Sequence, residues 1–163
     1  MKTLHAKQLI EQRGIDYFKA GSTFGALSEE AIRFLLENGK VIQLDEGDTL
    51  FEFGDPGDSF FVILQGRIRF TKPRRKDVTH IRDYTFGQEV GCVAMIGLHD
   101  RVGSTHAVED SIVIEVPCAV FHSLQLNLPT DFGVLLLNLS RELSRRLRES
   151  DNKLAEHAIQ PDQ

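Results

Sequence analysis

The chain has 163 residues, of which 41% are hydrophobic, so it is long enough for one domain with a core of its own. Its formal net charge of −5 argues against general nucleic-acid binding, and two cysteines, Cys92 and Cys118, do not make a disulfide framework. No apolar run is long enough to span a membrane, and the polar N-terminus lacks the apolar centre of a signal peptide. We therefore expect a reduced, cytoplasmic protein.

The first part of the chain predicts two helical regions. Residues 1–20 form a leading helix of modest quality, which Gly14 interrupts and Gly21-Ser22 ends. A clearer helix begins after Ser28, which is a good N-cap, and has acidic residues in its first turn. It ends at Gly39, a residue able to take a positive φ angle.

From residue 40 onward the hydrophobic pattern changes from helical to strand-like. Short runs rich in β-branched and aromatic residues alternate with turn residues, which is typical of antiparallel strands. The runs cover residues 40–45, 48–53, 58–64, 67–72, 77–84, 103–110 and 111–117, with a basic turn over 72–77. About eight strands predict a mainly β fold, an eight-stranded jelly-roll barrel or sandwich (double-stranded β-helix), with N-terminal helices and a long C-terminal helix.

The segment 86–107 combines groups that suit a phosphate and a sugar. It opens with a Gly-rich turn, runs into a short helical segment over Val90–Ile96, breaks at Gly97 and reaches Arg101. A helix N-terminus offers N–H donors to a phosphate, and an arginine adds a charge-assisted contact. Glu89 could accept a hydrogen bond from a ribose hydroxyl. The alternative is a tight turn followed by a core helix.

The C-terminal region predicts two more helices. Pro117 begins a short helix over 118–125, and Pro129 with Thr130-Asp131 begins a long one over about 132–158. One side of the long helix carries Leu136, Leu143, Leu147 and Leu154, together with Ser140 and Ser150. Such a seam is typical of a dimeric coiled coil, although the helix could also pack back on its own sandwich. We favour the dimer, because the helix is too long and polar for one small domain to cover.

This order of elements closely resembles the cyclic nucleotide-binding domain: a helix, a jelly roll containing LDEGDTLFEFGDPGDSFFVILQGRIRF, a Gly/Glu…Arg cassette and a Leu/Arg-rich helix. The resemblance covers roughly residues 22–155, and its most specific part is the turns at Gly47-Asp48, Gly54-Asp55, Gly57-Asp58 and Gly66. The end of the chain, LSRELSRRLRESDNKL, resembles the catabolite-activator/FNR-like sensor type without its DNA-binding helix-turn-helix. The resemblance implies an N-terminal helical extension (1–21), a jelly roll (22–130) and a C-terminal dimerisation helix and tail (131–163).

The resemblance also implies a function, that of a non-catalytic regulatory module that binds a cyclic nucleotide. It favours cAMP over cGMP, because Val102 lacks the hydroxyl that the family associates with cGMP. Only a handful of residues follow the long helix, so the expected output is a homodimer rearrangement or a separate partner protein. The ligand-binding positions that it implies are Gly87, Gln88, Glu89, Val90, Gly91, Cys92, Arg101, Val102, Gly103 and Ser150.

Two alignments of the cassette stay open. If Phe86-Gly87 matches the Phe-Gly of the family, Gln88 stands where the carboxylate is expected; if Glu89 is placed there, Gln88 replaces the glycine. We prefer Glu89, because it then precedes a small residue at the usual interval. The loop up to Arg101 is a few residues longer than usual, and Asp100 could hold the guanidinium of Arg101 away from a ligand.

Three other hypotheses concern the same fold. A degenerate member would bind no nucleotide and act as a dimerisation or protein-interaction scaffold, with Asp100 and the long loop closing the pocket. A metal site of the cupin type needs a His-x-His pair, which the histidines do not form, so we expect neither a metal nor an enzyme. The histidines considered are His80, His99, His106 and His122. Cys92 would favour the thiolate at a helix N-terminus, although a small core thiol is commoner than a redox role.

Overall fold

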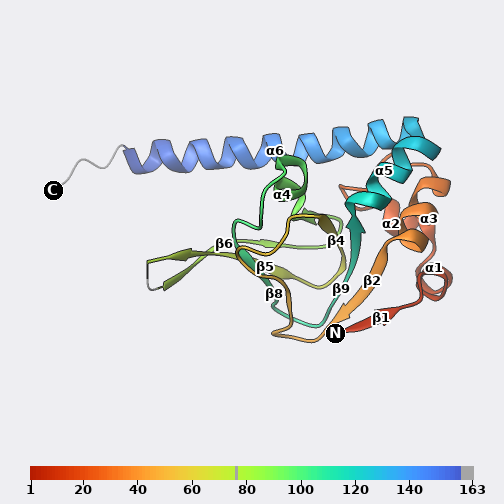
Figure 1. Ribbon diagram of the computed structural model, residues 1–163, viewed down its shortest axis with the longest axis horizontal. Coiled ribbons are helices and arrows are strands. Elements are labelled where there is room, and N and C mark those ends of the chain that lie inside the picture. Colours follow the sequence, from red (N-terminus) through yellow and green to blue (C-terminus); the bar gives the residue numbers. More distant parts are fainter. Residues whose placement is uncertain (76, 159–163) are drawn as a thin grey trace.

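The computed structural model describes residues 1–75 and 77–158. Its strands are β1 (Lys2–Leu4), β2 (Lys40–Leu44), β3 (Thr49–Phe51), β4 (Ser59–Gln65), β5 (Ile68–Arg74), β6 (Asp77–Tyr84), β7 (Glu89–Val90), β8 (Ser104–Ala107) and β9 (Ser111–Pro117). They form a five-stranded sheet in the order β1-β2-β9-β4-β7 and a four-stranded sheet in the order β3-β8-β5-β6 (Figure 1). The expected jelly roll with flanking helices is therefore confirmed, with β1 and β7 as additional short strands.

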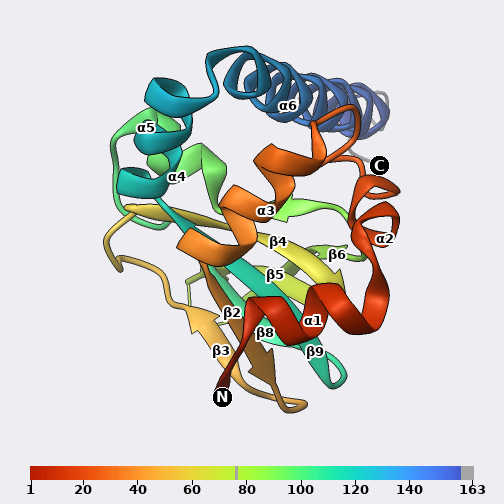
Figure 2. The same cartoon turned by 90° about the vertical axis from the view of Figure 1, so that its right-hand side faces the viewer.

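The helices of the described residues are α1 (Ala6–Arg13), α2 (Ile15–Lys19), α3 (Glu29–Asn38), α4 (Cys92–Gly97), α5 (Cys118–Asn127) and α6 (Pro129–Ala158). The N-terminal helices and α5 gather beside the five-stranded sheet, and α6 lies across them at the top of the molecule (Figure 2). In Figure 1, α6 runs on beyond α4 and over the side where the β5–β6 hairpin projects. The long helix thus passes from the helical part of the domain to the neighbourhood of the cassette.

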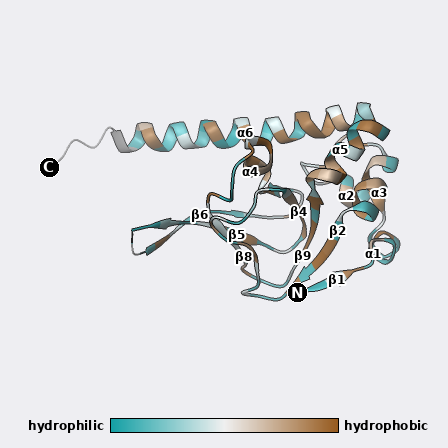
Figure 3. Cartoon of the chain, viewed as in Figure 1, coloured by the Kyte–Doolittle hydropathy of each residue, from teal (hydrophilic) through white to brown (hydrophobic). Residues whose placement is uncertain are grey.

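Strand β4 lies between two hydrophobic cores and explains why the sequence there is apolar without interruption. Successive side chains of a strand point to opposite faces. Phe60 and Val62 accordingly pack into the core under the helices, whereas Phe61 and Ile63 pack between the two sheets. The neighbouring strand β9, and β2 beyond it in the same sheet, are also largely hydrophobic in Figure 3. The two cores fix the sandwich and the helical layer to one central strand.

The inner face of α6 packs on its own domain. Leu135 and Leu139 are fully buried in the core under the helices. The side-chain amide of Asn138 donates to the carbonyl oxygens of Thr23 (3.1 Å) and Gly25 (2.7 Å). These contacts hold the first half of α6 against the N-terminal part of the chain.

The leucine seam expected for a dimer lies only in part on the exposed side of α6. Leu143 packs partly against the domain core, so it belongs to the packed-back face as well. The other three leucines are exposed: Leu136 by 39%, Leu147 by 63% and Leu154 by 69%. The helix therefore covers its own domain and still presents leucines to solvent, and the dimer stays a prediction. Residues 159–163, in the tail expected after the helix, lie outside the described residues.

The N-terminus departs from the expected helix. Residues 2–4 form β1, which pairs with β2 from Lys2↔Gln43 to Leu4↔Val41. Pairing with β2 gives the backbone N–H and carbonyl groups of these residues hydrogen-bond partners within the sheet. Gly14 (φ 75°) separates α1 from α2, at the interruption that the sequence indicated.

The basic segment 72–77 is mostly strand rather than turn. The β5–β6 ladder continues through Lys72↔Thr79 and Arg74↔Asp77. Only Arg75 (φ 53°) and residue 76, which lies outside the described residues, remain between the strands. Pro73 is tolerated because β8 pairs with β5 only as far as Thr71, which leaves one side of β5 free at the proline.

Gly39 ends α3 as expected, but not for the expected reason. Its φ angle is −77°, so no left-handed backbone is needed. A Cβ atom would instead lie 2.7 Å from the carbonyl oxygens of both Glu115 and Leu35. The glycine is required by the close approach of β9 to the end of α3.

We predict opposite effects for two glycine-to-alanine changes. Gly39→Ala should lower the free energy of unfolding by about 1–3 kcal/mol, because backbone atoms must move away from the new methyl group. Gly133→Ala should raise it by about 0.5–1 kcal/mol, since Gly133 lies in α6 and an added methyl group would have nothing within 4 Å of it. Urea denaturation of both variants measures the change, and a Gly39→Ala protein as stable as the wild type would contradict the steric argument.

Candidate functional site

The site is built from a turn, a short helix and a returning loop between β6 and β8, which we call the cassette (residues 86–103). Strand β7 pairs with β4 and so fixes the start of the cassette to the centre of the sandwich. Gly91 follows in a left-handed conformation (φ 96°) and opens α4. A Cβ atom at Gly91 would also lie 2.7 Å from Nη1 of Arg101, so this position needs glycine for both its backbone and its space.

The loop after α4 brings Arg101 back to the turn where the cassette begins. The backbone N–H of Arg101 donates to Asp55 (2.8 Å), and its carbonyl oxygen accepts from the N–H of Gly54 (2.9 Å). Its side chain is only 3% exposed. Nη1 donates to the carbonyl oxygen of Gly91 (3.0 Å) and Nη2 to the hydroxyl of Ser59 (3.0 Å). The guanidinium is thus held inside the domain at the wall of the cassette.

Aromatic rings lie against this guanidinium, and no carboxylate of the described residues contacts it directly. It lies 4.4 Å from the ring centre of Phe51 and 5.8 Å from that of Phe61. Burial lowers the pKa of Arg101, against a smaller opposing effect of nearby carboxylates, but an arginine at this site stays charged. Its Nε has no hydrogen-bond partner, and no carboxylate of the described residues forms an ion pair with it. Arg101 is therefore a buried cation whose direct hydrogen-bond partners are neutral.

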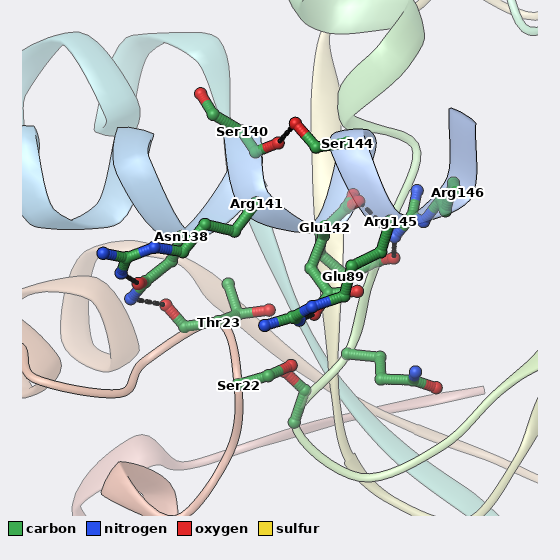
Figure 4. A network of polar contacts seen from close by, with 12 residues as sticks. Ser22, Thr23, Glu89, Asn138, Ser140, Arg141, Glu142, Ser144, Arg145 and Arg146 are labelled. Carbon is green, nitrogen blue, oxygen red and sulfur yellow. Dashed lines mark hydrogen bonds and ion pairs between the residues drawn. The ribbon is translucent and has the colours of Figure 1, made fainter. Parts of the chain in front are cut away.

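Glu89 is fully buried at the other side of the cassette and is held by α6. One carboxylate oxygen accepts from the N–H of Cys92 (3.2 Å), and the other forms an ion pair with Arg146 (Figure 4). Arg146 also donates to the carbonyl oxygen of Glu89 (2.7 Å) and lies 5.0 Å from the ring centre of Tyr84. Burial is the largest single effect and lowers the pKa of Arg146, but the charge and hydrogen bond of Glu89 together with Tyr84 and Cys92 raise that pKa by more. The cassette and the long helix are joined by this pair.

The environment of Cys92 agrees with the preferred interpretation, a small core thiol. The residue begins α4 but is fully buried. Burial, and next the negative charge of Glu89, raise the pKa of the Cys92 thiol far above its ordinary value. The thiolate alternative is disfavoured, because desolvation outweighs the effect of the helix N-terminus. Cys92 is a core thiol.

A cavity of about 230 Å³ lies between the cassette, the β5–β6 hairpin and α6. Its lining residues are Phe51, Phe70, Lys72, Ile81, Arg82, Tyr84, Val90, Gly91, Val93, Ala94, Arg101, Val102, Arg146 and Ser150. The lining combines apolar side chains with four cations and contains no carboxylate. Such a wall suits a ligand that has an apolar ring face and a negative charge.

The structure brings half of the expected ligand-binding residues to the cavity. Those that line it are Val90, Gly91, Arg101, Val102 and Ser150. Glu89 lies behind them, paired with Arg146. Gly103 lies beside β5, where a Cβ atom would meet the carbonyl oxygen of Thr71 at 2.4 Å.

The two candidate positions for the carboxylate differ in their surroundings. The side-chain oxygen of Gln88 accepts from the N–H of Thr85 (2.8 Å), so Gln88 closes the turn before the cassette. Gly87 (φ 78°) lies in the same turn and accepts from the N–H of Thr23 (2.9 Å). Asp100 is exposed, and the partners of the Arg101 guanidinium are other residues.

Sequence reasoning missed Arg146, Arg82 and Ser59. Arg146 lies one turn before Ser150 on α6, so the i, i+4 spacing from a residue already assigned to the site was a usable signal. Arg82 lies on β6, opposite Phe70 of β5 in the hairpin, and no sequence motif identifies it. Ser59 reaches Arg101 from the first residue of β4, a contact between positions 42 apart that only the fold brings together.

Neither a metal cluster nor a membrane helix is found in residues 1–75 and 77–158. The histidines, cysteines and carboxylates there form no group of three or more that could hold a metal ion. No helix in those ranges is both long and apolar enough to cross a membrane.

The sequence model of the cyclic nucleotide-binding domain matches residues 41–127. Among curated proteins, lysophospholipase NTE1 of Cryptococcus neoformans is 29% identical over 110 residues, which is 68% of this chain and 7% of that protein. The NTE1 protein of Mycosarcoma maydis is 27% identical over 106 residues, or 65% of this chain and 5% of that protein. The chain therefore spans less than a tenth of the length of these relatives.

Solved structures share the fold at low sequence identity. A cyclic nucleotide-binding domain from Methylobacillus flagellatus superposes with a TM-score of 0.82 and 23% identity, over 98% of this chain and 90% of that one. The catabolite activator protein of Thermus thermophilus gives a TM-score of 0.73 and 23% identity, over 85% of this chain and 63% of that one. The long helix after the jelly roll is included in the first of these matches.

We predict that Arg146→Leu lowers the free energy of unfolding by about 3–5 kcal/mol, because it leaves the charge of Glu89 buried and unpaired. Arg148→Leu changes an exposed arginine on the same helix and should stay within about 0.5 kcal/mol of the wild type. The double variant Glu89→Gln with Arg146→Leu should be more stable than Arg146→Leu alone. Urea denaturation measures all three, and equal losses for Arg146→Leu and Arg148→Leu would refute a stabilising role of the pair.

Proposed function

The chain belongs to the cyclic nucleotide-binding domain family, and we propose that it is a cytoplasmic, non-catalytic sensory module that binds a cyclic nucleotide, with cAMP favoured over cGMP. The observation that carries this proposal is the buried charge of Arg101. Its guanidinium is 3% exposed, and its hydrogen-bond partners are a carbonyl and a hydroxyl. A buried cation is stabilised by a directly bound anion, and the phosphate of a cyclic nucleotide would supply one.

The other parts of the nucleotide have candidate partners in the wall of the same cavity and directly behind it. Glu89 can accept a hydrogen bond from a ribose hydroxyl, and Arg146 holds its carboxylate at the cassette. Ser150 lines the cavity from α6 and can reach the purine. Val102 also lines it and has no hydroxyl for the guanine amino group, which supports cAMP.

The signal would pass through the contacts between the cassette and α6. A ligand shifts an equilibrium only by its difference in affinity for the two states, so the ligand must touch a group that α6 also holds. Glu89 is such a group. The output is a rearrangement of a homodimer or contact with a separate partner protein. The lysophospholipase activity in the relatives' names belongs to proteins of which this chain matches 7% or less.

One observation supports a second candidate function, a degenerate domain that serves as a dimerisation or interaction scaffold. Glu89 already has an ion-pair partner within the chain, and the cavity of about 230 Å³ lies below the usual size of small-molecule sites, about 300–1,000 Å³. In this alternative the charge of Arg101 serves packing with Phe51 and the cassette turn. Binding measurements separate the two functions.

We predict that cAMP binds in titration calorimetry and raises the melting temperature, as mass action requires for a ligand of the folded state. At about 100 times its Kd it should add about 2.7 kcal/mol to the free energy of unfolding. cGMP should bind more weakly. Absence of both heat and thermal shift with either nucleotide would favour the scaffold.

The matched variant for this test is Arg101→Gln, which should abolish the cAMP-dependent shift. Arg75→Gln removes a charge from the exposed hairpin end and should leave the shift intact. If Arg101→Gln kept the full shift, the phosphate would have to bind elsewhere.

The exposed leucines of α6 support the proposed homodimer. Leu136, Leu147 and Leu154 recur at the spacing of a coiled-coil seam and lie on the outside of the described domain. A second copy would cover them and place the two α6 helices together. Leu143 contributes less to such a seam, because it packs partly on its own core.

We predict that Leu147→Glu shifts the protein to a monomer in light scattering coupled to size exclusion, because it buries a charge in the seam. Leu126→Glu changes a leucine of similar exposure on α5, 70% against 63%, and should leave the mass unchanged. A Leu147→Glu variant with the mass of a dimer would rule out this seam.

A further inference from the structure

The outer part of the β5–β6 hairpin stands free of the rest of the sandwich. Strand β8 pairs with β5 only as far as Thr71, and β6 is the edge strand of its sheet. Residues 72–75 and 77–79 therefore form a two-stranded ribbon, which projects at one end of the molecule in Figure 1. We call these residues the ribbon. A partner can reach its end without displacing another described element.

The ribbon gathers positive charge on an acidic chain. The formal net charge of the chain is −5, yet the sequence KPRRKD over residues 72–77 holds four cations and one carboxylate. Lys72, Arg74 and Arg75 are exposed, and among residues 1–75 and 77–158 none of the three forms an ion pair. Arg69 and Arg82, nearer the sandwich, are both paired with carboxylates. The positive charge of the ribbon is thus left for a partner.

Apolar side chains lie beside these cations. Val78 is 70% exposed and stands opposite Pro73 across the ribbon. Residues directly opposite each other in an antiparallel pair share a face, and neighbours along a strand alternate between faces. Pro73 and Val78 therefore lie on one face of the ribbon, and Lys72 and Arg74 lie on the other. The ribbon has a cationic face and a small apolar face, back to back.

We propose that the ribbon docks on the surface of a membrane that contains anionic phospholipids. Each lysine or arginine near such a surface strengthens binding about fivefold, because the anionic headgroups attract it. The exposed valine can enter the headgroup region beside the charges. A DNA backbone would use the cations but not the apolar face. A specific protein interface takes about 20–30 residues a side, far more than the ribbon has.

The projection of the ribbon matters because the rest of the chain is acidic. Electrostatic interactions in water are screened over about 8 Å at physiological ionic strength. A basic segment within the surface of the sandwich would bring its acidic neighbours equally close to the membrane. The ribbon instead carries its charges away from the carboxylates of the domain. The attachment is weak and reversible, since a few cations and one valine do not anchor a protein stably by themselves.

The test is sedimentation of the full chain with sucrose-loaded vesicles, without nucleotide. One set of vesicles contains phosphatidylcholine alone and the other adds about 30% phosphatidylserine, both at about 50 mM salt. The protein should bind the second set only, and about 500 mM salt should release it. Arg74→Gln combined with Arg75→Gln should lower the partition coefficient about 25-fold. Val78→Ser should lower it about threefold or more and leave its salt dependence unchanged.

The matched control removes two cations elsewhere. Lys7→Gln combined with Lys19→Gln makes the same change in net charge on α1 and α2, which lie at the opposite end of the molecule from the ribbon in Figure 1. This variant should bind the anionic vesicles as the wild type does. Equal losses in the two double variants would overturn the proposal, since a general effect of net charge would explain both.

Two further outcomes would overturn the proposal. Cations and a proline also protect an exposed strand edge from pairing with other chains. If that were their only role, the wild type would bind neither set of vesicles, and the variant without Arg74 and Arg75 would aggregate. Binding to a DNA duplex that the same variant weakens, without binding to vesicles, would instead assign the ribbon to nucleic acid. Because no nucleotide is present, a failure of cAMP binding would leave this proposal standing.

Discussion

The ion pair between Glu89 and Arg146 fixes the long helix α6 to the cassette, and the rest of the site is arranged around it. Burying two charges is costly, and their attraction offsets that cost only when further hydrogen bonds complete the geometry. Here the N–H of Cys92 donates to the carboxylate, and Arg146 donates again to the carbonyl oxygen of Glu89 and lies against Tyr84. Because its partners come from both β6 and the cassette, Arg146 holds three elements at one point.

A second connection runs through the turn between α2 and α3. Ser22 and Thr23 donate to the carbonyl oxygen of Gly87 at the entrance of the cassette, and Asn138 of α6 donates to the carbonyl oxygen of Thr23 (Figure 4). Gly21 and Gly87 approach so closely that a Cβ atom on Gly21 would lie 2.6 Å from the Cα atom of Gly87. The cassette, the N-terminal turn and α6 therefore form a closed ring of contacts, and a shift of any one of them must break hydrogen bonds to the other two.

The sequence predicted what depends on local chemistry and missed what depends on distant contacts. Ser28 could be assigned as an N-cap because its partner, the N–H of Ala31, lies three residues away. Gly39 was assigned correctly but for the wrong reason, since only the fold reveals the β9 backbone beside it. In the site, Arg101 could be singled out from its place after a short helix. The partners that bury it and Arg146, which engages Glu89, come from β4 and α6, and periodicity carries no information about which side chains meet.

Sharing Glu89 between the helix and the proposed ribose site has a thermodynamic consequence. The ligand has one affinity for the state in which Arg146 holds the Glu89 carboxylate and another for the state in which it does not. The free energy that couples nucleotide binding to the position of α6 cannot exceed the difference between these two binding free energies. Coupling of binding free energies is reciprocal, so whatever fixes α6 must change nucleotide affinity by the same factor. A second copy packed along Leu147 would fix the helix at the residue next to Arg146, about 1.5 Å further along the helix axis. On the proposed function, dimerisation and nucleotide binding are therefore not independent events, and the affinity of the chain for its ligand should depend on its own concentration.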